Sequence, residues 1–160
     1  KFLIPTKNQA YKHYVKSDAE IIALGERSIE GRKKSGYIGK EDPKELGEKI
    51  VNSLIRFLTS GPIVAIVLEG SKAIKIVRKL VGSTEPLQSD VGTIRGDFTL
   101  DSYDMADLGN RAVRNLVHAA ASEEDMEHET KVWFSEKEIC SYNNTRDRIL
   151  YDVNLDGVKE

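Results

Sequence analysis

The feature that most constrains the fold is a continuous apolar run, IVAIVL, at residues 63–68. Four of its six residues are β-branched, which favours extended backbone. A strand that is apolar at every position, and not only at alternate positions, is typical of a sheet covered on both faces. The run therefore predicts a central strand with helices packed against it.

Signals for the starts and stops of helices surround this run. Ser17 and Glu20 have the spacing of a capping box, which starts a helix, and Gly36 supplies a left-handed stop for that helix. Asp42-Pro43 starts another helix, in which Ile50, Leu54, Ile55 and Leu58 form an apolar stripe. The expected order is a strand at 1–5, helices at 8–15, 17–34 and 42–60, the strand at 63–68, a helix at 71–80 opened by Ser71, a strand at 114–119, and a helix at 122–133. Strands that alternate with helices in this way indicate an α/β or α+β sandwich.

Composition excludes several classes of function. The 160 residues fit one domain, and 24 Lys and Arg against 26 Asp and Glu give a net charge of −2. That balance provides no bulk attraction to nucleic acid or to an anionic membrane. No apolar run approaches the roughly 20 residues of a membrane span. The single cysteine, Cys140, excludes an internal disulfide and is typical of a reducing compartment, so we expect a cytoplasmic protein.

One histidine has a chemically suggestive position. In RNLVHAAASEED (114–125) a short apolar run places His118 just before the Ser122 helix start. A lone histidine beside apolar residues is more often a packed core residue. However, the end of a strand ahead of a helix is also where a side chain can meet a ligand. Asn115 is close in sequence, and Glu129 in the following helix can fold back to orient the ring, as a nucleophilic imidazole requires.

Two arginines flank a loop rich in hydroxyl and amide donors. Arg78 and Arg95 lie on either side of GSTEP (82–86), which contains Thr84. Each arginine alone is an ordinary surface charge. Two guanidiniums, a threonine and a histidine together are what a transferring phosphoryl group requires, because guanidinium binds phosphate oxygens with paired hydrogen bonds. The chain has no Walker-type G-x-x-x-x-G-K-[ST] loop and no kinase glycine-rich loop.

Several segments, in their order along the chain, closely resemble nucleoside diphosphate kinase. They are TSGPIVAIVLEG (59–70), VRKLVGSTEP (77–86), GTIRGDF (92–98), RNLVHAAAS (114–122) and EHETKVWF (127–134). The combination of GTIRGDF with RN followed by the histidine is highly specific. The resemblance implies a ferredoxin-like antiparallel sheet covered by helices, an α+β fold. It also implies a kinase-like domain over 1–142, with a helical insertion at about 17–50, a further insertion at 99–110, and a polar tail at 143–160.

The activity implied by the resemblance is a ping-pong phosphoryl transfer. A nucleoside triphosphate gives its γ-phosphoryl group to His118, and a nucleoside diphosphate then takes it. Carried over position by position, His118 and Glu129 are the catalytic pair. The nucleotide-binding residues are Tyr14, Arg78, Thr84, Arg95 and Asn115, and the candidate base contacts are Ile50 and Ala112. Mg²⁺ is expected to arrive on the nucleotide phosphates, with no metal site of the protein's own.

The sequence departs from the family pattern in ways that leave a second interpretation open. The family opens with a strand carrying a Lys-Pro-Asp motif, which is absent here, so we expect the first strand to be missing and the chain to be a fragment. Ala120 stands where the family has a serine that supports the glutamate, and Val91 replaces a proline. The alternative is therefore a non-catalytic relative that binds nucleotides or forms oligomers. In either case a homo-oligomer, a hexamer or a tetramer, is expected, and no nucleic-acid or membrane partner.

Overall fold

The computed structural model describes residues 1–34, 36, 39–142 and 145–151. Its helices and strands, in chain order, are β1 (Phe2–Leu3), α1 (Lys7–Tyr14), α2 (Asp18–Lys34), α3 (Pro43–Leu58), β2 (Ile63–Val64), α4 (Ala73–Val81), the 3₁₀ turn η1 (Pro86–Gln88), α5 (Ile94–Phe98), α6 (Tyr103–Leu108), α7 (Glu123–Trp133), the 3₁₀ turn η2 (Glu136–Glu138) and α8 (Thr145–Tyr151). The polar tail predicted at 143–160 lies largely outside the described residues.

The long helices form where their capping signals predict. The Asp42 side chain accepts a hydrogen bond from the amide of Glu45 at the start of α3, and the Ser122 side chain accepts one from the amide of Asp125 at the start of α7. The helix predicted to open at Ser71 instead begins at Ala73, with Lys72 in the left-handed conformation at its N-cap. The side chains of Asp42 and Ser122 satisfy amides that have no partner within the helix, whereas Lys72 makes no side-chain cap bond.

The prediction of a central, fully buried strand at 63–68 is wrong. Among the described residues, Ile63–Val64 pairs antiparallel to Phe2–Leu3, and the ladder ends where Ala65 exchanges hydrogen bonds with Lys1. Beyond Ala65 the chain leaves the ladder, and the side chains of residues 66–68 are exposed. An apolar run encodes extended backbone, but a strand also requires a neighbour with which to pair.

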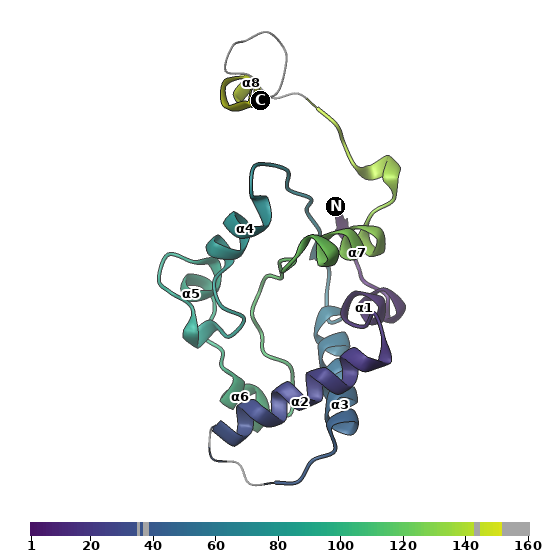
Figure 1. The fold of residues 1–160 in the computed structure, drawn as a ribbon, viewed down its shortest axis with the longest axis vertical. Helices are drawn as coiled ribbons and strands as arrows, with labels where there is room; N and C mark the ends of the chain where they lie inside the picture. The colour runs from purple at the N-terminus through teal and green to yellow at the C-terminus, as the bar shows by residue number, and fades with distance from the viewer. Residues whose placement is uncertain (35, 37–38, 143–144, 152–160) are drawn as a thin grey trace.

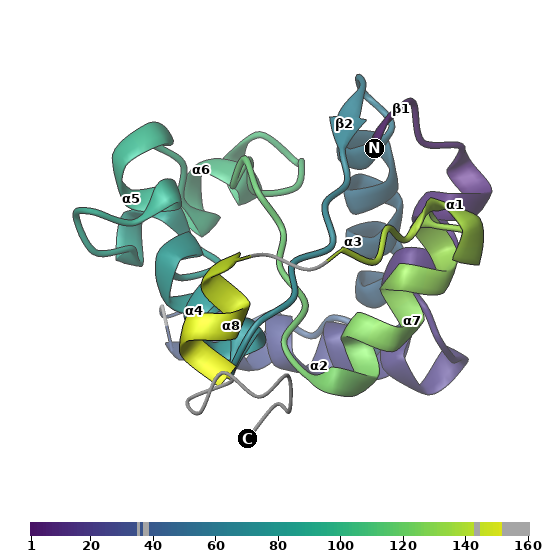
Figure 2. The ribbon, with the colours of Figure 1, turned by 90° about the horizontal axis from the view of Figure 1, so that it is seen from above.

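The strand predicted at 114–119 is also absent. This segment carries no strand hydrogen bonds, and Leu116 has a φ of 65°. Figures 1 and 2 show it crossing the middle of the molecule, with α4, α5 and α6 on one side and α1, α3 and α7 on the other. It must therefore be held by side chains, because no sheet ladder holds it.

Helices dominate the packing. α2 lies against α3, and α1 contacts both α3 and α7. Leu46 and Val51 on α3, Ala10 and Val15 around α1, and Trp133 on α7 are buried among them. Helices plus a small antiparallel sheet make an open α+β arrangement. No helix within the described ranges is long and apolar enough to cross a membrane.

Two buried glycines allow α2 and α3 to approach each other. A Cβ on Gly25 would collide with the carbonyl oxygen of Pro43, and a Cβ on Gly47 with that of Ile21. Both obstacles are backbone atoms, which cannot rotate away. Gly31, also on α2, has open space where its Cβ would lie.

We therefore expect Gly47→Ala to force the two helices apart and to lower the free energy of unfolding by roughly 1–3 kcal/mol, the usual result of overpacking. Gly31→Ala is the matched control, and its better helix propensity should raise stability by up to about 1 kcal/mol. Urea denaturation of both variants measures the difference. Equal stabilities would show that the helices are not in close contact at Gly47.

Candidate active site

His118 is the centre of a cluster of polar and aromatic side chains. Its Nε2 lies 2.8 Å from Oε1 of Glu129, which α7 projects back toward the segment 114–119. The His118 side chain is 49% exposed and the Glu129 side chain 18% exposed. The ring is therefore neither sealed in the core nor free to rotate, which contradicts the interpretation of His118 as a packing residue.

The bond to Glu129 determines which nitrogen of His118 can react. An ionised carboxylate only accepts hydrogen bonds, so Nε2 must carry the proton that it donates. In a neutral imidazole the other nitrogen, Nδ1, then holds the lone pair. The carboxylate also balances positive charge that develops on the ring when Nδ1 forms a bond.

Arg95 is the principal support of the histidine segment. Its Nε and one terminal nitrogen donate to the carbonyl of Val117, at 3.1 and 2.7 Å. Its other terminal nitrogen donates to the carbonyls of Gly82 and Ser83, at 3.2 and 2.8 Å. The residue is only 3% exposed. These bonds use four of the five guanidinium hydrogens, so Arg95 joins the 82–84 loop to the residue before His118 and has one N–H left for a ligand.

Arg78 approaches the same segment from α4. It is exposed and donates one hydrogen bond, at 3.3 Å, to the carbonyl of Ala119. Burial and the nearby positive charge of Arg78 both lower the pKa of Arg95. In the part of the chain that the structure describes, neither guanidinium forms an ion pair with a carboxylate. Two neighbouring cations without a counterion favour binding of an anion between them.

Asn115 and Thr84 meet across the two segments. The Asn115 amide donates to the carbonyl of Thr84 at 3.3 Å, and the Thr84 side chain is exposed beside it. Leu116, between Asn115 and Val117, takes its left-handed conformation here. The five residues predicted from the motifs around the loop and the histidine, Arg78, Thr84, Arg95, Asn115 and His118, are therefore brought to one place.

α1 completes the cluster with a residue that sequence reasoning missed. The ring of His13 is 8% exposed and lies 4.7 Å, centroid to centroid, from the ring of His118 and 4.7 Å from that of Tyr14. Burial, with a contribution from the charge of Glu129, raises the pKa of Tyr14 to about 12. Tyr14 is thus in the cluster as predicted. The only sequence signal for His13 was its place beside Tyr14 on the buried side of a helix, which is common in proteins.

The two candidate base contacts are not linked to this cluster. Ile50 lies on α3 and Ala112 in the irregular chain before Asn115, and both are half-buried. No contact among the described residues places either one beside His118. Their involvement with a nucleotide base stays a prediction.

Asp101, in the predicted insertion 99–110, anchors the chain that leads to His118. Its carboxylate accepts from Arg111 at 2.6 and 2.9 Å and from the amide of Arg114 at 2.7 Å. Thr99 adds a hydrogen bond to the carbonyl of Arg114. Residues 99–110, which include α6, therefore support the segment 111–119 through the hydrogen bonds of Thr99 and Asp101.

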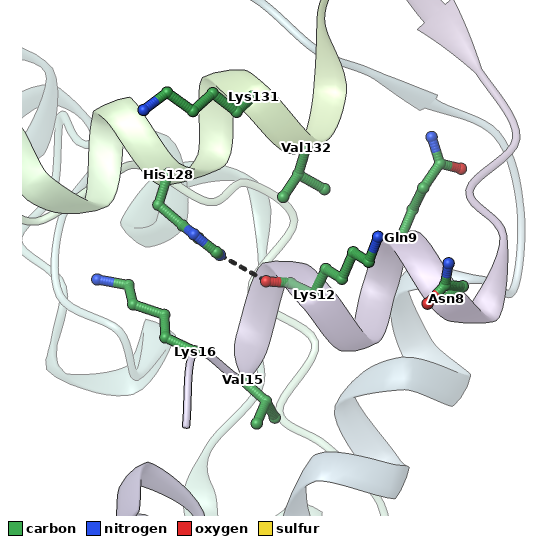
Figure 3. A pocket seen from close by; sticks show the side chains of 8 residues that line it. All are labelled: Asn8, Gln9, Lys12, Val15, Lys16, His128, Lys131 and Val132. Carbon is green, nitrogen blue, oxygen red and sulfur yellow. Dashed lines mark hydrogen bonds between the residues drawn. The ribbon is translucent and has the colours of Figure 1, made fainter. Parts of the chain in front are cut away.

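A hollow of about 520 Å³ lies on another face of α1 and α7. Figure 3 shows the side chains of Lys16 and Lys131 extending to the left of the view and that of Lys12 to the right, so the three lysines do not converge on a common point. Lys16 is also paired with Asp125 at 2.7 Å, and His128 donates to the carbonyl of Lys12 at 2.6 Å. His118 does not line this hollow, so it is distinct from the histidine cluster.

Comparison with known proteins identifies the family of the chain. The family model for nucleoside diphosphate kinase matches residues 40–139. The chain belongs to the nucleoside diphosphate kinase family. A nucleoside diphosphate kinase from Pyrobaculum aerophilum is 42% identical over 133 residues, which are 80% of this chain and 73% of that protein. One from Methanobrevibacter smithii is 43% identical over 100 residues, 62% of this chain and 60% of that protein.

Solved structures of nucleoside diphosphate kinases have the same fold. The Pyrobaculum aerophilum NDP kinase superposes with a TM-score of 0.81 at 38% identity, over 88% of this chain and 80% of that one. A nucleoside-diphosphate kinase from Borrelia burgdorferi was solved as a transition-state mimic with bound vanadate and ADP. It gives a TM-score of 0.71 at 32% identity, over 93% of this chain and 75% of that one. The α+β fold class predicted from the sequence is confirmed, although the sheet formed by the described residues is smaller than predicted.

Replacing Asp101 tests whether this carboxylate stabilises the kinase fold. The guanidinium of Arg111 holds the pKa of Asp101 well below its usual value of 3.8. A depressed folded-state pKa means that the stabilisation is present above the unfolded-state pKa and is lost as pH falls through the folded-state pKa. We expect Asp101→Asn to lower the free energy of unfolding by roughly 1–2 kcal/mol at pH 7, with the difference narrowing below about pH 4.

Urea titrations at pH 7, 4 and 3 measure this difference. Asp104→Asn changes an exposed carboxylate on α6 and serves as the control, with an expected change within roughly 0.5 kcal/mol. If Asp101→Asn lowered the free energy of unfolding by the same amount at all three pH values, the ion pair with Arg111 would not be the source of the stabilisation.

Proposed function

We propose that the protein is a nucleoside diphosphate kinase that uses His118 as its nucleophile. Nδ1 of His118 attacks the γ-phosphorus of a nucleoside triphosphate, the N–P bond forms, and the bond from phosphorus to the β,γ-bridging oxygen breaks. The nucleoside diphosphate leaves with that electron pair. A second nucleoside diphosphate reverses the step with its terminal phosphate oxygen, so the reaction is ping-pong. The observation that carries the proposal is the exposed His118 ring with Nε2 bound to Glu129 and Nδ1 left to react.

The phosphate groups are assigned to the arginine pair. Arg78 has most of its guanidinium hydrogens available, and Arg95 offers its one remaining N–H from a buried position. Their mutual repulsion is relieved when phosphate binds between them. In the transition state the three equatorial oxygens carry the charge, so fixed positive groups lower the barrier. Thr84 and Asn115 supply further donors at the same point, Asn115 to the sugar hydroxyl and a phosphate.

Tyr14 and the two apolar residues are assigned supporting contacts. The elevated pKa of Tyr14 keeps its hydroxyl protonated at neutral pH, so it can donate a hydrogen bond to the transferred phosphate. Ile50 and Ala112 are proposed to contact the base through apolar surface alone. Apolar contact does not read the hydrogen-bonding edge of a base, and we therefore propose broad tolerance for different nucleotides.

Mg²⁺ enters this proposal as part of the substrate. Glu129 is the carboxylate nearest His118 in the described region, and the histidine already occupies it. A hard cation such as Mg²⁺ prefers several oxygen ligands and is readily held by nucleotide phosphates. The proposed substrate is thus the magnesium complex of the nucleotide. We also propose that the protein is cytoplasmic and forms a homo-oligomer, a hexamer or a tetramer, as the family resemblance implies.

One observation favours a second candidate, a relative that binds nucleotides without transferring phosphate. Arg95 donates four of its five guanidinium hydrogens to backbone carbonyls. This limits the stabilisation that it can give to the charge of a transition state. In that case nucleotide would raise the melting temperature, but no phosphate would become attached to the protein. The two candidates differ in the covalent step alone.

We expect incubation with γ-labelled ATP and Mg²⁺ to place label on the protein in an acid-labile, base-stable form, as is typical of a phosphohistidine. His118→Ala should reduce labelling to background, because no other side chain replaces Nδ1. His128→Ala removes a histidine of α7 that lies outside the cluster, and this variant should be labelled like the unaltered chain. Acid precipitation and filter counting at intervals would measure the labelling.

Addition of an unlabelled nucleoside diphosphate should then remove the label and yield the labelled triphosphate. Stabilisation by nucleotide without label would establish the second candidate. Label that persists in His118→Ala would refute the assignment of the nucleophile.

A further inference from the structure

We propose that His13 is a positioning residue, which holds the His118 ring in the orientation needed for phosphoryl transfer, and that Trp133 in turn fixes His13 through a buried hydrogen bond. This inference rests on the proposed function of His118. The juxtaposition that carries it is an edge-on contact of the two imidazoles, with 4.7 Å between ring centroids and 82° between ring planes. The indole of Trp133 donates to Nδ1 of His13 at 3.2 Å.

A single hydrogen bond cannot fix the plane of His118. The bond from Nε2 to Glu129 fixes one atom of the ring, but the ring can still tilt about that bond. A perpendicular ring at 4.7 Å removes this freedom, since tilting His118 would drive it into His13. With Glu129 at one point and His13 against the ring, the direction of the Nδ1 lone pair is defined. Misplacement of a reacting atom by about 1 Å can cost roughly 100-fold in rate.

His13 is itself rigid because it is buried and bonded. It is 8% exposed, and Trp133, the only tryptophan of the chain, is also 8% exposed. The Trp133 ring lies 5.4 Å from His13, and the Tyr14 ring lies 4.7 Å from it. An unpaired indole N–H in this location would be costly, so the hydrogen bond keeps Trp133 and His13 together. α7 thus controls His118 twice, through Glu129 directly and through Trp133 and His13.

The Trp133 bond also determines the protonation of His13. The indole can only donate, so Nδ1 of His13 must accept and the ring proton lies on Nε2. Burial, reinforced by the neighbouring His118, lowers the pKa of His13 to about 4, and the ring is neutral at pH 7. A neutral His13 does not compete with His118 for the charge of Glu129. That charge remains available when the phosphorylated His118 ring becomes cationic.

The same bond argues against a metal ion in the cluster. Ligand atoms of His13, His118 and Glu129 lie within 4.8 Å of one another, close enough for a shared cation. Metal-binding histidines, however, donate their second ring N–H to a carboxylate or carbonyl. Here Nδ1 of His13 faces a donor and Nε2 carries the proton, so neither nitrogen offers a lone pair unless the Trp133 bond is broken. Positioning of His118 is the role that is consistent with this tautomer.

Three variants of the full chain separate positioning from packing. His13→Phe keeps a flat ring but removes the Nδ1 acceptor. His13→Asn restores an acceptor oxygen near the place of Nδ1 in a smaller side chain. Trp133→Phe leaves His13 intact and removes the indole donor together with part of the aromatic ring system. His128→Gln changes a histidine of α7 that bonds to Lys12 and not to the ring cluster, and it is the control.

The first readout is the single-turnover rate of His118 phosphorylation by Mg²⁺-ATP, measured together with nucleotide affinity. We expect His13→Phe and Trp133→Phe to slow phosphorylation by about tenfold or more while nucleotide affinity changes less than threefold. His13→Asn should recover part of the rate, and His128→Gln should match the unaltered chain. A purely structural role would instead lower the folded fraction, as seen by thermal melting, and leave the rate per folded molecule unchanged.

The second readout is ¹⁵N NMR of the His118 ring, which needs no activity. The unaltered chain should show His118 as a single tautomer with the proton on Nε2, and Trp133→Phe should give a mixture or broadened signals. Unchanged His118 signals together with unchanged rates in Trp133→Phe and in folded His13→Phe would overturn the proposal. If the unaltered chain forms no phosphohistidine, the proposed function fails, and the NMR result alone decides whether His13 positions the ring.

Discussion

The 2.8 Å hydrogen bond between His118 and Glu129 is the interaction on which the proposed roles of the surrounding residues depend. It places the proton on Nε2 and leaves the lone pair on Nδ1, and it supplies negative charge at the nitrogen opposite the reacting one. Without it His118 would be a partly exposed imidazole with two interchangeable nitrogens. With it, the ring has one reactive atom, and the neighbouring guanidiniums can be understood as a site for the group that this atom attacks.

The segment that carries His118, the proposed nucleophile, is held in an unusual way for the end of a predicted strand. No ladder of backbone hydrogen bonds supports residues 114–119 among the described residues. Side chains from flanking elements bind its backbone instead, from Asp101 and Thr99 at Arg114, from Arg95 at Val117 and from Arg78 at Ala119. Because the arginines hold the segment and also face the proposed phosphate site, ligand binding and local order should be coupled.

Local signals in the sequence predicted the longer helices but not α5, α6 or α8, and the motifs predicted which residues would meet. Caps at Asp42 and Ser122 depend on contacts within four residues, so they can be read directly. The strands predicted at 63–68 and 114–119 were wrong, since extended backbone becomes a strand only with a distant partner, and apolarity does not specify that partner. His13 was missed for a similar reason. Its role depends on Trp133 and His118, which are more than a hundred residues away along the chain.

The nitrogen of the His118 ring that carries the phosphate shows whether Glu129 determines which nitrogen reacts. After phosphorylation of ¹⁵N-histidine-labelled protein by Mg²⁺-ATP, the coupling between ³¹P and ¹⁵N identifies the nitrogen that carries the phosphoryl group. The account predicts phosphate on Nδ1, with Nε2 still protonated against Glu129. Phosphate on Nε2 would show that the bond to Glu129 is broken before reaction, and it would contradict the role that the geometry gives to this carboxylate.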